Sequence, residues 1–191
     1  MRQAVLDPKH PDIGLAQLNM ASTVEALGRA DEALRMKRAA AAFFRANAGP
    51  THPLVGDALN ATASTLVNMK RYREALAEFA AAVQVRTTAL GPNHPSTAAS
   101  YGGMARCYAE LGNLPQAATH YEKTLGALGS DPSRAPVMWN GTIERLAAVY
   151  RTLGRVEVAA TWEAKRLPAP QRAPGSSRGA RAHAAAPIRG W

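Results

Sequence analysis

Residues 90–125 read LGPNHPSTAASYGGMARCYAELGNLPQAATHYEKTL, and this stretch decides the fold. Its apolar residues recur at steps of three and four up to Leu111, which is the period of a helix that faces a core. Gly112 and Asn113 then interrupt the pattern, and Pro115 stands where the first turn of a second helix tolerates a proline. The stretch therefore predicts two antiparallel helices joined by a short turn.

The same pattern returns every 42 residues along the chain, and His-Pro pairs mark it at 10–11, 52–53 and 94–95. Alanines hold two positions of this period: Ala21, Ala63, Ala105 and Ala147 in the first helices, and Ala33, Ala75, Ala117 and Ala159 in the second. Two helices approach closely only where side chains are small, so we expect these alanines to pack the hairpins. Units that recur at a fixed distance stack on one another, which predicts an all-α solenoid of about four hairpins.

These columns resemble the tetratricopeptide repeat in its 42-residue form, as found in kinesin light chains. The residues that carry the resemblance are Ala105, Tyr108, Gly112, Ala117 and Tyr121, and it extends over about residues 1–167. It implies that the first helices line a concave groove that binds a peptide or a helical segment of a partner protein. The expected function is a protein-interaction scaffold and not an enzyme.

The chain divides into three segments by composition. Residues 1–11 are expected to be the end of a preceding repeat and its loop, and residues 12–167 the array, with repeats at about 12–48, 54–90, 96–129 and 137–167. Residues 168–191 are rich in alanine, proline, arginine and glycine and predict a disordered basic tail. The fourth unit departs most from the pattern and is expected to cap the array.

Residues 1–6 match the end of a second helix, which leaves two interpretations open. In the first, the chain is a fragment or accessory module of a larger adaptor similar to kinesin light chains, or of a signalling protein with such repeats. In the second, the array begins with a bare repeat face. An uncapped apolar face favours self-association.

The sequence contains no constellation typical of catalysis, nucleotide binding or a metalloprotease. Equivalent positions in neighbouring hairpins lie about 10 Å apart, whereas zinc requires its ligands within about 2.1 Å of one point. His10, His52 and His94 therefore do not converge, and we expect no metal and no cofactor. The single cysteine, Cys107, excludes an internal disulfide and favours the cytoplasm. No apolar run approaches the roughly 20 residues of a membrane span.

Helical geometry, combined with the concave face that the resemblance implies, gives eight candidate groove residues: Asn19, Ser22, Asn60, Ser64, Asn68, Arg106, Arg145 and Arg151. Short amides and hydroxyls suit a peptide backbone, and arginines suit acidic side chains. The predicted partner is therefore a protein or peptide, with an acidic one as an option. Weak binding of nucleic acid or another polyanion through the basic tail is a second alternative, disfavoured because the tail has few arginines and no recognition motif.

Overall fold

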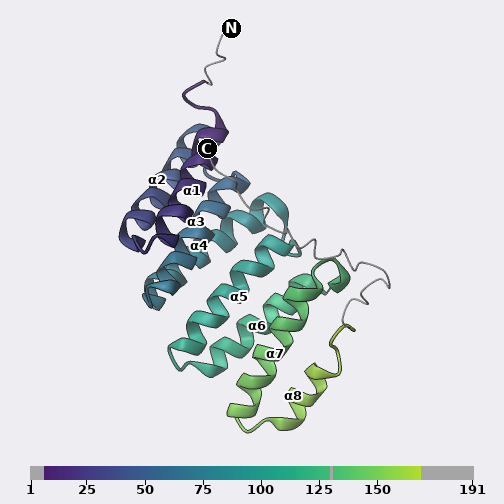
Figure 1. The fold of residues 1–191 in the computed structure, drawn as a ribbon. Coiled ribbons are helices and arrows are strands. Elements are labelled where there is room, and N and C mark those ends of the chain that lie inside the picture. The colour runs from purple at the N-terminus through teal and green to yellow at the C-terminus, as the bar shows by residue number, and fades with distance from the viewer. Residues whose placement is uncertain (1–6, 130, 169–191) are drawn as a thin grey trace, which may run out of the picture.

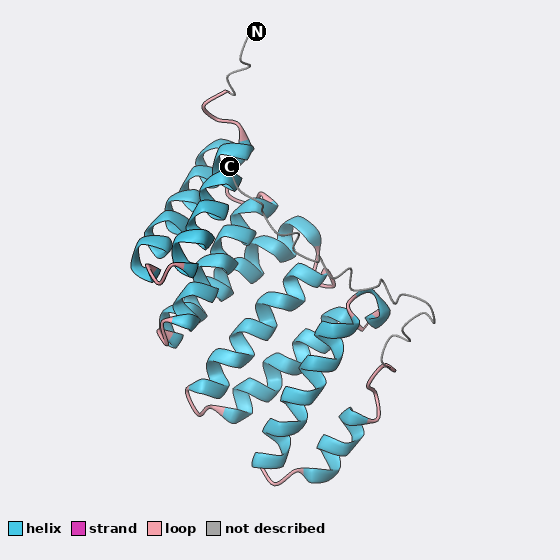
Figure 2. Ribbon diagram, in the orientation of Figure 1, coloured by secondary structure: helices cyan, strands magenta, loops and turns pink. Residues whose placement is uncertain are grey.

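A computed structural model describes residues 7–129 and 131–168 of the 191-residue chain. These ranges form consecutive helical hairpins, as the ribbon shows from purple to yellow (Figure 1), and they contain no strand (Figure 2). The helices are α1 (Pro11–Ala26), α2 (Ala30–Ala48), α3 (Pro53–Asn68), α4 (Tyr72–Leu90), α5 (Pro95–Glu110), α6 (Leu114–Leu128), α7 (Pro136–Thr152) and α8 (Val156–Glu163). A short 3-10 turn, η1 (Pro132–Arg134), precedes α7. The expected all-α solenoid is confirmed.

Each helix packs against the helix before it and the helix after it. The first helices of successive hairpins also contact one another, α1 with α3, α3 with α5 and α5 with α7. Within the described residues, the second helices make no contacts of similar extent with each other. The array therefore curves with α1, α3, α5 and α7 on its inner side.

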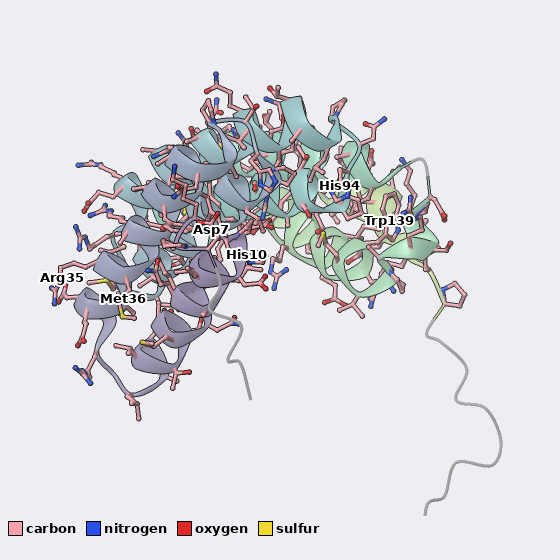
Figure 3. All side chains as sticks on the ribbon, turned by 90° about the horizontal axis from the view of Figure 1, so that it is seen from above. Asp7, His10, Arg35, Met36, His94 and Trp139 are labelled. Atoms are coloured by element: carbon pink, nitrogen blue, oxygen red, sulfur yellow. The ribbon has the colours of Figure 1, made fainter. Side chains whose placement is uncertain are left out.

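The three His-Pro pairs start the first helices of three hairpins. Each histidine has an extended backbone, with ψ between 132° and 139°, and the following proline is the first helical residue. The histidine Nδ1 also accepts the backbone N–H two residues later, at 3.1–3.3 Å. His10 and His94 belong to different hairpins (Figure 3), and each acts locally as the cap of its own helix.

The turn inside each hairpin requires one residue with a positive φ. Gly28, Gly112 and Gly154 supply it at φ 82°, 75° and 73°, and the second hairpin uses Lys70 at φ 59° instead. The next residue donates its N–H to a carbonyl five residues back, as Arg29 does to Val24. This closes the helix end in a Schellman-like turn.

The alanine columns lie inside the array. All eight predicted packing alanines, four in the first helices and four in the second, are 0–1% exposed. Six of them, those of the second, third and fourth hairpins, belong to apolar clusters that join neighbouring hairpins. One of these clusters contains Leu34 of α2, Leu66 of α3, Phe79 of α4 and Cys107 of α5. The core is therefore shared between hairpins instead of being divided among them.

The two ends of the described array differ. Met20 of α1 is 58% exposed and Leu27, directly after α1, is 70% exposed, whereas Thr62, one repeat after Met20, is 1% exposed. At the other end the chain folds back along α7, where Trp139 Nε1 donates to the carbonyl of Lys165 at 2.9 Å. Residues 1–6 and 169–191, and with them nearly all of the predicted tail, lie outside the described residues. None of the described helices combines the length and apolar character of a membrane span.

Candidate functional site: a hollow between the first helices

A hollow of about 280 Å³ opens between α3, α5 and α7 on the inner side of the array. Side chains from these helices form its walls, and α4 and α6 contribute to its floor. Its lining consists of Asn60, Ser64, Val67, Asn68, Phe79, Ala99, Gly102, Gly103, Arg106, Tyr121, Thr124, Met138, Thr142 and Arg145. We call this hollow the groove pocket.

The groove pocket brings together five of the eight candidate residues, namely Asn60, Ser64, Asn68, Arg106 and Arg145. Asn19 and Ser22 are exposed on α1 and do not line it, and the Ser22 hydroxyl donates to its own helix at Leu18 O. Arg151, near the end of α7, also lies outside the lining and forms an ion pair with Glu163 of α8. Five of the eight candidate residues therefore line the groove pocket, and the other three lie outside it, on α1 and near the end of α7.

The groove pocket carries positive charge that the described protein does not neutralise. Among the described residues, no carboxylate lies within ion-pair distance of Arg106 or Arg145. By contrast, Arg86, Arg151 and Arg166 all pair with acids. The two exposed guanidinium groups are thus available to a bound carboxylate.

Two adjacent glycines in the middle of α5 give the pocket its depth. Gly103 is required by packing, because a Cβ there would lie 2.3 Å from the Phe79 ring. Gly102 is different: its nearest side-chain neighbour for a Cβ would be Thr124 at an ordinary 3.7 Å. An interior helical glycine costs about 1 kcal/mol relative to alanine. Packing inside the chain does not explain Gly102, and a partner that approaches the α5 backbone would.

A buried arginine holds Asn60 at the edge of the pocket. Arg86 of α4 is only 5% exposed and donates through NH1 to Asn60 Oδ1 at 3.1 Å and to Ser100 Oγ at 2.7 Å. Its NH2 donates to Asp57 Oδ1 at 2.7 Å. Ser100 in turn donates to Asn60 Oδ1 at 3.1 Å. We call this group the Arg86 network; it joins α3, α4 and α5.

A buried lysine holds Asn68 in a similar way. Lys37 of α2 is 4% exposed and donates to Glu25 Oε2 of α1 and to Thr65 Oγ1 of α3, at 2.5 and 2.8 Å. Glu25 Oε1 accepts from Asn68 Nδ2 at 2.9 Å. Burial raises the pKa of Glu25, but the hydrogen bonds from Lys37 and Asn68 and the Lys37 charge outweigh it, so its pKa lies below 4.5. The carboxylate of this Lys37 network is therefore ionised at neutral pH.

The sequence alone did not identify the residues that hold Asn60 and Asn68 in place, or those that form the floor of the groove pocket. The floor residues Phe79 and Tyr121 come from second helices, which the concave-face pattern does not include. Two signals were present: a lysine at position 37, where the next two units have aromatics, and the glycine pair at 102–103. Neither signal reveals which residues Lys37 or the glycine pair contacts, because those residues lie in other hairpins.

The described residues offer little reactive chemistry. Burial raises the pKa of the Cys107 thiol to about 11, which keeps it protonated. His120 is buried beside Tyr108, with ring centroids 5.1 Å apart, and does not line the groove pocket. No group of three or more histidine, cysteine or acidic side chains lies close enough to hold a metal ion in the part of the chain described here.

The helical hairpins and the inner groove define a repeat protein of the interaction type. A sequence model of the tetratricopeptide repeat matches residues 12–76 and 54–128. Together these matches span more than half of the chain, which therefore belongs to the tetratricopeptide repeat family. Comparison with curated protein sequences finds no match.

Solved structures support the same fold. A putative kinesin light chain from Podosopora anserina with nearly identical TPR-like repeats superposes with a TM-score of 0.68 at 22% identity, covering 80% of this chain and 72% of that one. BtubC (BKLC) from P. vanneervenii gives a TM-score of 0.72 at 18% identity, covering 89% and 72%. The TPR domain of Arabidopsis FLU gives 0.54 at 22% identity, covering 65% and 100%. At these identities the likeness shows the fold alone, and it confirms the kinesin-light-chain-like type of repeat.

Proposed function

We propose that this protein is a scaffold whose groove pocket binds a peptide segment of a partner protein, and that the segment carries at least one acidic side chain. The repeat fold supports a protein-interaction scaffold in general. The observation that carries the finer proposal is the pair of guanidinium groups, Arg106 and Arg145, facing one hollow without an acidic partner among the described residues. A bound carboxylate would complete this arrangement in fork geometry.

The shape of the pocket supports a side chain inserted between the helices. Its floor contains the rings of Phe79 and Tyr121, and Gly102 leaves the α5 backbone open above Thr124. An apolar side chain of the partner would bury its surface there, at about 25 cal/mol per Å². The pocket thus combines an apolar floor with a polar rim, as peptide-binding grooves commonly do.

Charge reversal tests the proposal. The full chain is used to select peptides from a random dodecapeptide display library, and a selected peptide is measured by fluorescence anisotropy. Arg106→Glu/Arg145→Glu should weaken binding by at least about 100-fold, because two favourable charge contacts become repulsive. Arg35→Glu/Arg45→Glu is the matched control, since both arginines are exposed on α2 and Arg35 points away from the array (Figure 3). Equal affinity in the two double variants would contradict the proposal.

The other expectations stay predictions. A scaffold with a lone, buried, protonated thiol suits a reducing compartment, and we propose the cytoplasm. Self-association through the first hairpin would use the exposed Met20 and Leu27. Size-exclusion chromatography with light scattering tests it. Polyanion binding depends on the tail, which lies outside the described residues.

A further inference from the structure

We infer that the two buried networks fix the direction in which the groove amides can hydrogen-bond, so that Asn60 offers an N–H to the partner and Asn68 offers a carbonyl oxygen. The inference rests on the proposed function and deepens it, because it specifies which backbone groups a bound peptide presents. Arg86, Glu25 and Lys37 then act as positioning residues: they do not touch the partner, but they orient the residues that do.

The orientation of Asn60 follows from the chemistry of its neighbours. A guanidinium group can only donate, so the side-chain atom of Asn60 that meets Arg86 NH1 at 3.1 Å must be the oxygen. Ser100 donates to the same oxygen at 3.1 Å. The amide nitrogen is left without a hydrogen-bond partner among the described residues, on a side chain that lines the groove pocket. Asn60 is therefore a donor toward the groove.

Asn68 has the opposite orientation. The ionised carboxylate of Glu25 can only accept, so the atom of Asn68 that lies 2.9 Å away must be the amide nitrogen. Lys37 and Thr65 bind the other oxygen of Glu25 and hold the carboxylate in place. The carbonyl oxygen of Asn68 has no partner in the part of the chain described and belongs to a pocket-lining, exposed residue. Asn68 is therefore an acceptor toward the groove.

This polarity favours an extended peptide over a helix. The backbone N–H and C=O groups of a helical partner are already paired within the helix, so they cannot reach Asn60 and Asn68. An extended backbone exposes both kinds of group along its length. The two asparagines are eight residues apart on α3, about 12 Å, which an extended chain covers in three to four residues. The bound segment then presents an acceptor at Asn60 and an N–H at Asn68.

The first experiment changes the donor at Asn60 and leaves the network intact. Asn60→Asp keeps an oxygen for Arg86 and Ser100, so the melting temperature should be unchanged or higher. The atom that faces the groove becomes a charged acceptor, so affinity for a peptide selected by the unmodified full chain should fall by about tenfold or more. The peptide is tested as selected and with its acidic side chains replaced by their amides, which removes repulsion by the new carboxylate. A purely structural role for Asn60 predicts unchanged affinity for the neutral peptide, because the internal hydrogen bonds of residue 60 survive.

The second experiment leaves the protein unchanged and therefore does not depend on the folding of a variant. Each backbone amide of the selected peptide is replaced in turn by an ester, which removes one N–H. One position should weaken binding to the unmodified chain by about two- to tenfold. Against Asn68→Ala, which lacks the acceptor, the same ester should have no further effect.

The outcomes separate the two proposals. If the selected peptides do not depend on Arg106 and Arg145, both the proposed function and this inference are overturned. If they depend on the arginines but bind Asn60→Asp normally and show no ester that couples to Asn68, the polarity is wrong while the groove function stands. Loss of affinity in Asn60→Asp at an unchanged melting temperature, together with an ester effect that vanishes in Asn68→Ala, supports both.

Discussion

One position of the repeat is occupied by Lys37, Phe79 and Tyr121 in the first three hairpins. Lys37 and Phe79 need different residues opposite them in the next hairpin. Phe79 packs against α5 only because residue 103 is glycine. The position one repeat before Gly103 is Ala61, where Lys37 extends instead to Glu25 and Thr65. Phenylalanine and lysine are therefore not interchangeable at this position, because the residue opposite them also differs: it is Gly103 for Phe79 and Ala61 for Lys37.

The two glycines of α5 should respond in opposite ways to the same substitution. Gly103→Ala should lower the free energy of unfolding by about 1–3 kcal/mol, since the new methyl group overlaps the Phe79 ring. Gly102→Ala should raise it by about 0.5–1 kcal/mol, because it meets only ordinary contacts and reduces the entropy of the unfolded chain. Urea denaturation followed by circular dichroism measures both. Similar effects at the two sites would contradict the assignment of Phe79 to Gly103.

Buried His120 should make stability depend on pH. Burial, and then the charge of Lys123, lower the pKa of His120 below 6.5 in the folded chain. The unfolded chain therefore takes up the proton first, so the contribution of the neutral imidazole is complete above about pH 6.5 and is lost as the pH falls toward the folded-state pKa. The unfolding free energy of the unmodified chain minus that of His120→Phe should decrease between pH 7 and pH 5.5. A difference that stays constant over this range would count against a neutral, buried His120.

At the scale of an element, the ends of the helices depend on a few chemical devices. The first helices of three hairpins begin with a histidine cap before proline, while α7 begins after Ala135 with no side-chain cap hydrogen bond. Two residues after each first helix ends, the chain has a residue with positive φ, which is glycine in three hairpins and Lys70 in the second. A side chain in this left-handed region costs about 1–2 kcal/mol.

Exchanging the turn residues should therefore change stability in opposite directions. Lys70→Gly should stabilise the array by roughly 0.5 kcal/mol, because the relief of strain exceeds the entropy that glycine adds to the unfolded chain. Gly112→Lys should destabilise it by a similar amount for the same reason. Thermal denaturation of the two variants, with Lys123→Gly as an exposed control inside α6, measures the effect. A loss of stability in Lys70→Gly would show that the lysine side chain stabilises the turn.

At the scale of the whole molecule, the hairpins share their interior. One apolar cluster takes residues from α2, α3, α4 and α5, and another extends from Ala98 of α5 to Ala159 of α8. The Arg86 and Lys37 networks add polar links between hairpins in the middle of the array. Damage to one hairpin should therefore spread to its neighbours.

A larger side chain in an alanine column tests this coupling. Ala63 and Ala105 are 0% exposed, so Ala63→Leu or Ala105→Leu should push apart the helices of one hairpin and cost about 1–3 kcal/mol or more. We expect a lower melting temperature and a single transition in helical circular dichroism. Ala80→Leu, on the exposed side of α4, is the control and should change little. Full stability in both buried variants would contradict the packing of the columns.

The periodic features of the sequence were enough to predict the helices and their pairing in hairpins, because these depend on residues a few positions apart. The groove was predicted less completely. Contacts such as Glu25 with Asn68, 43 residues away, depend on the rotation between hairpins, which no local pattern contains. The Nδ1 hydrogen bonds of the three histidine caps were missed because capping by histidine is uncommon.

Cys107 allows local opening in the middle of the array to be measured without an added label. It is the single thiol of the chain, it is 0% exposed, and its pKa of about 11 leaves almost no thiolate at neutral pH. A disulfide reagent can therefore modify it only when α5 separates from its neighbours, so the modification rate reports how often that separation occurs. A peptide that bridges α3 and α7 would hold these helices together and slow the reaction. The modification rate of Cys107 would then report whether the groove pocket is occupied.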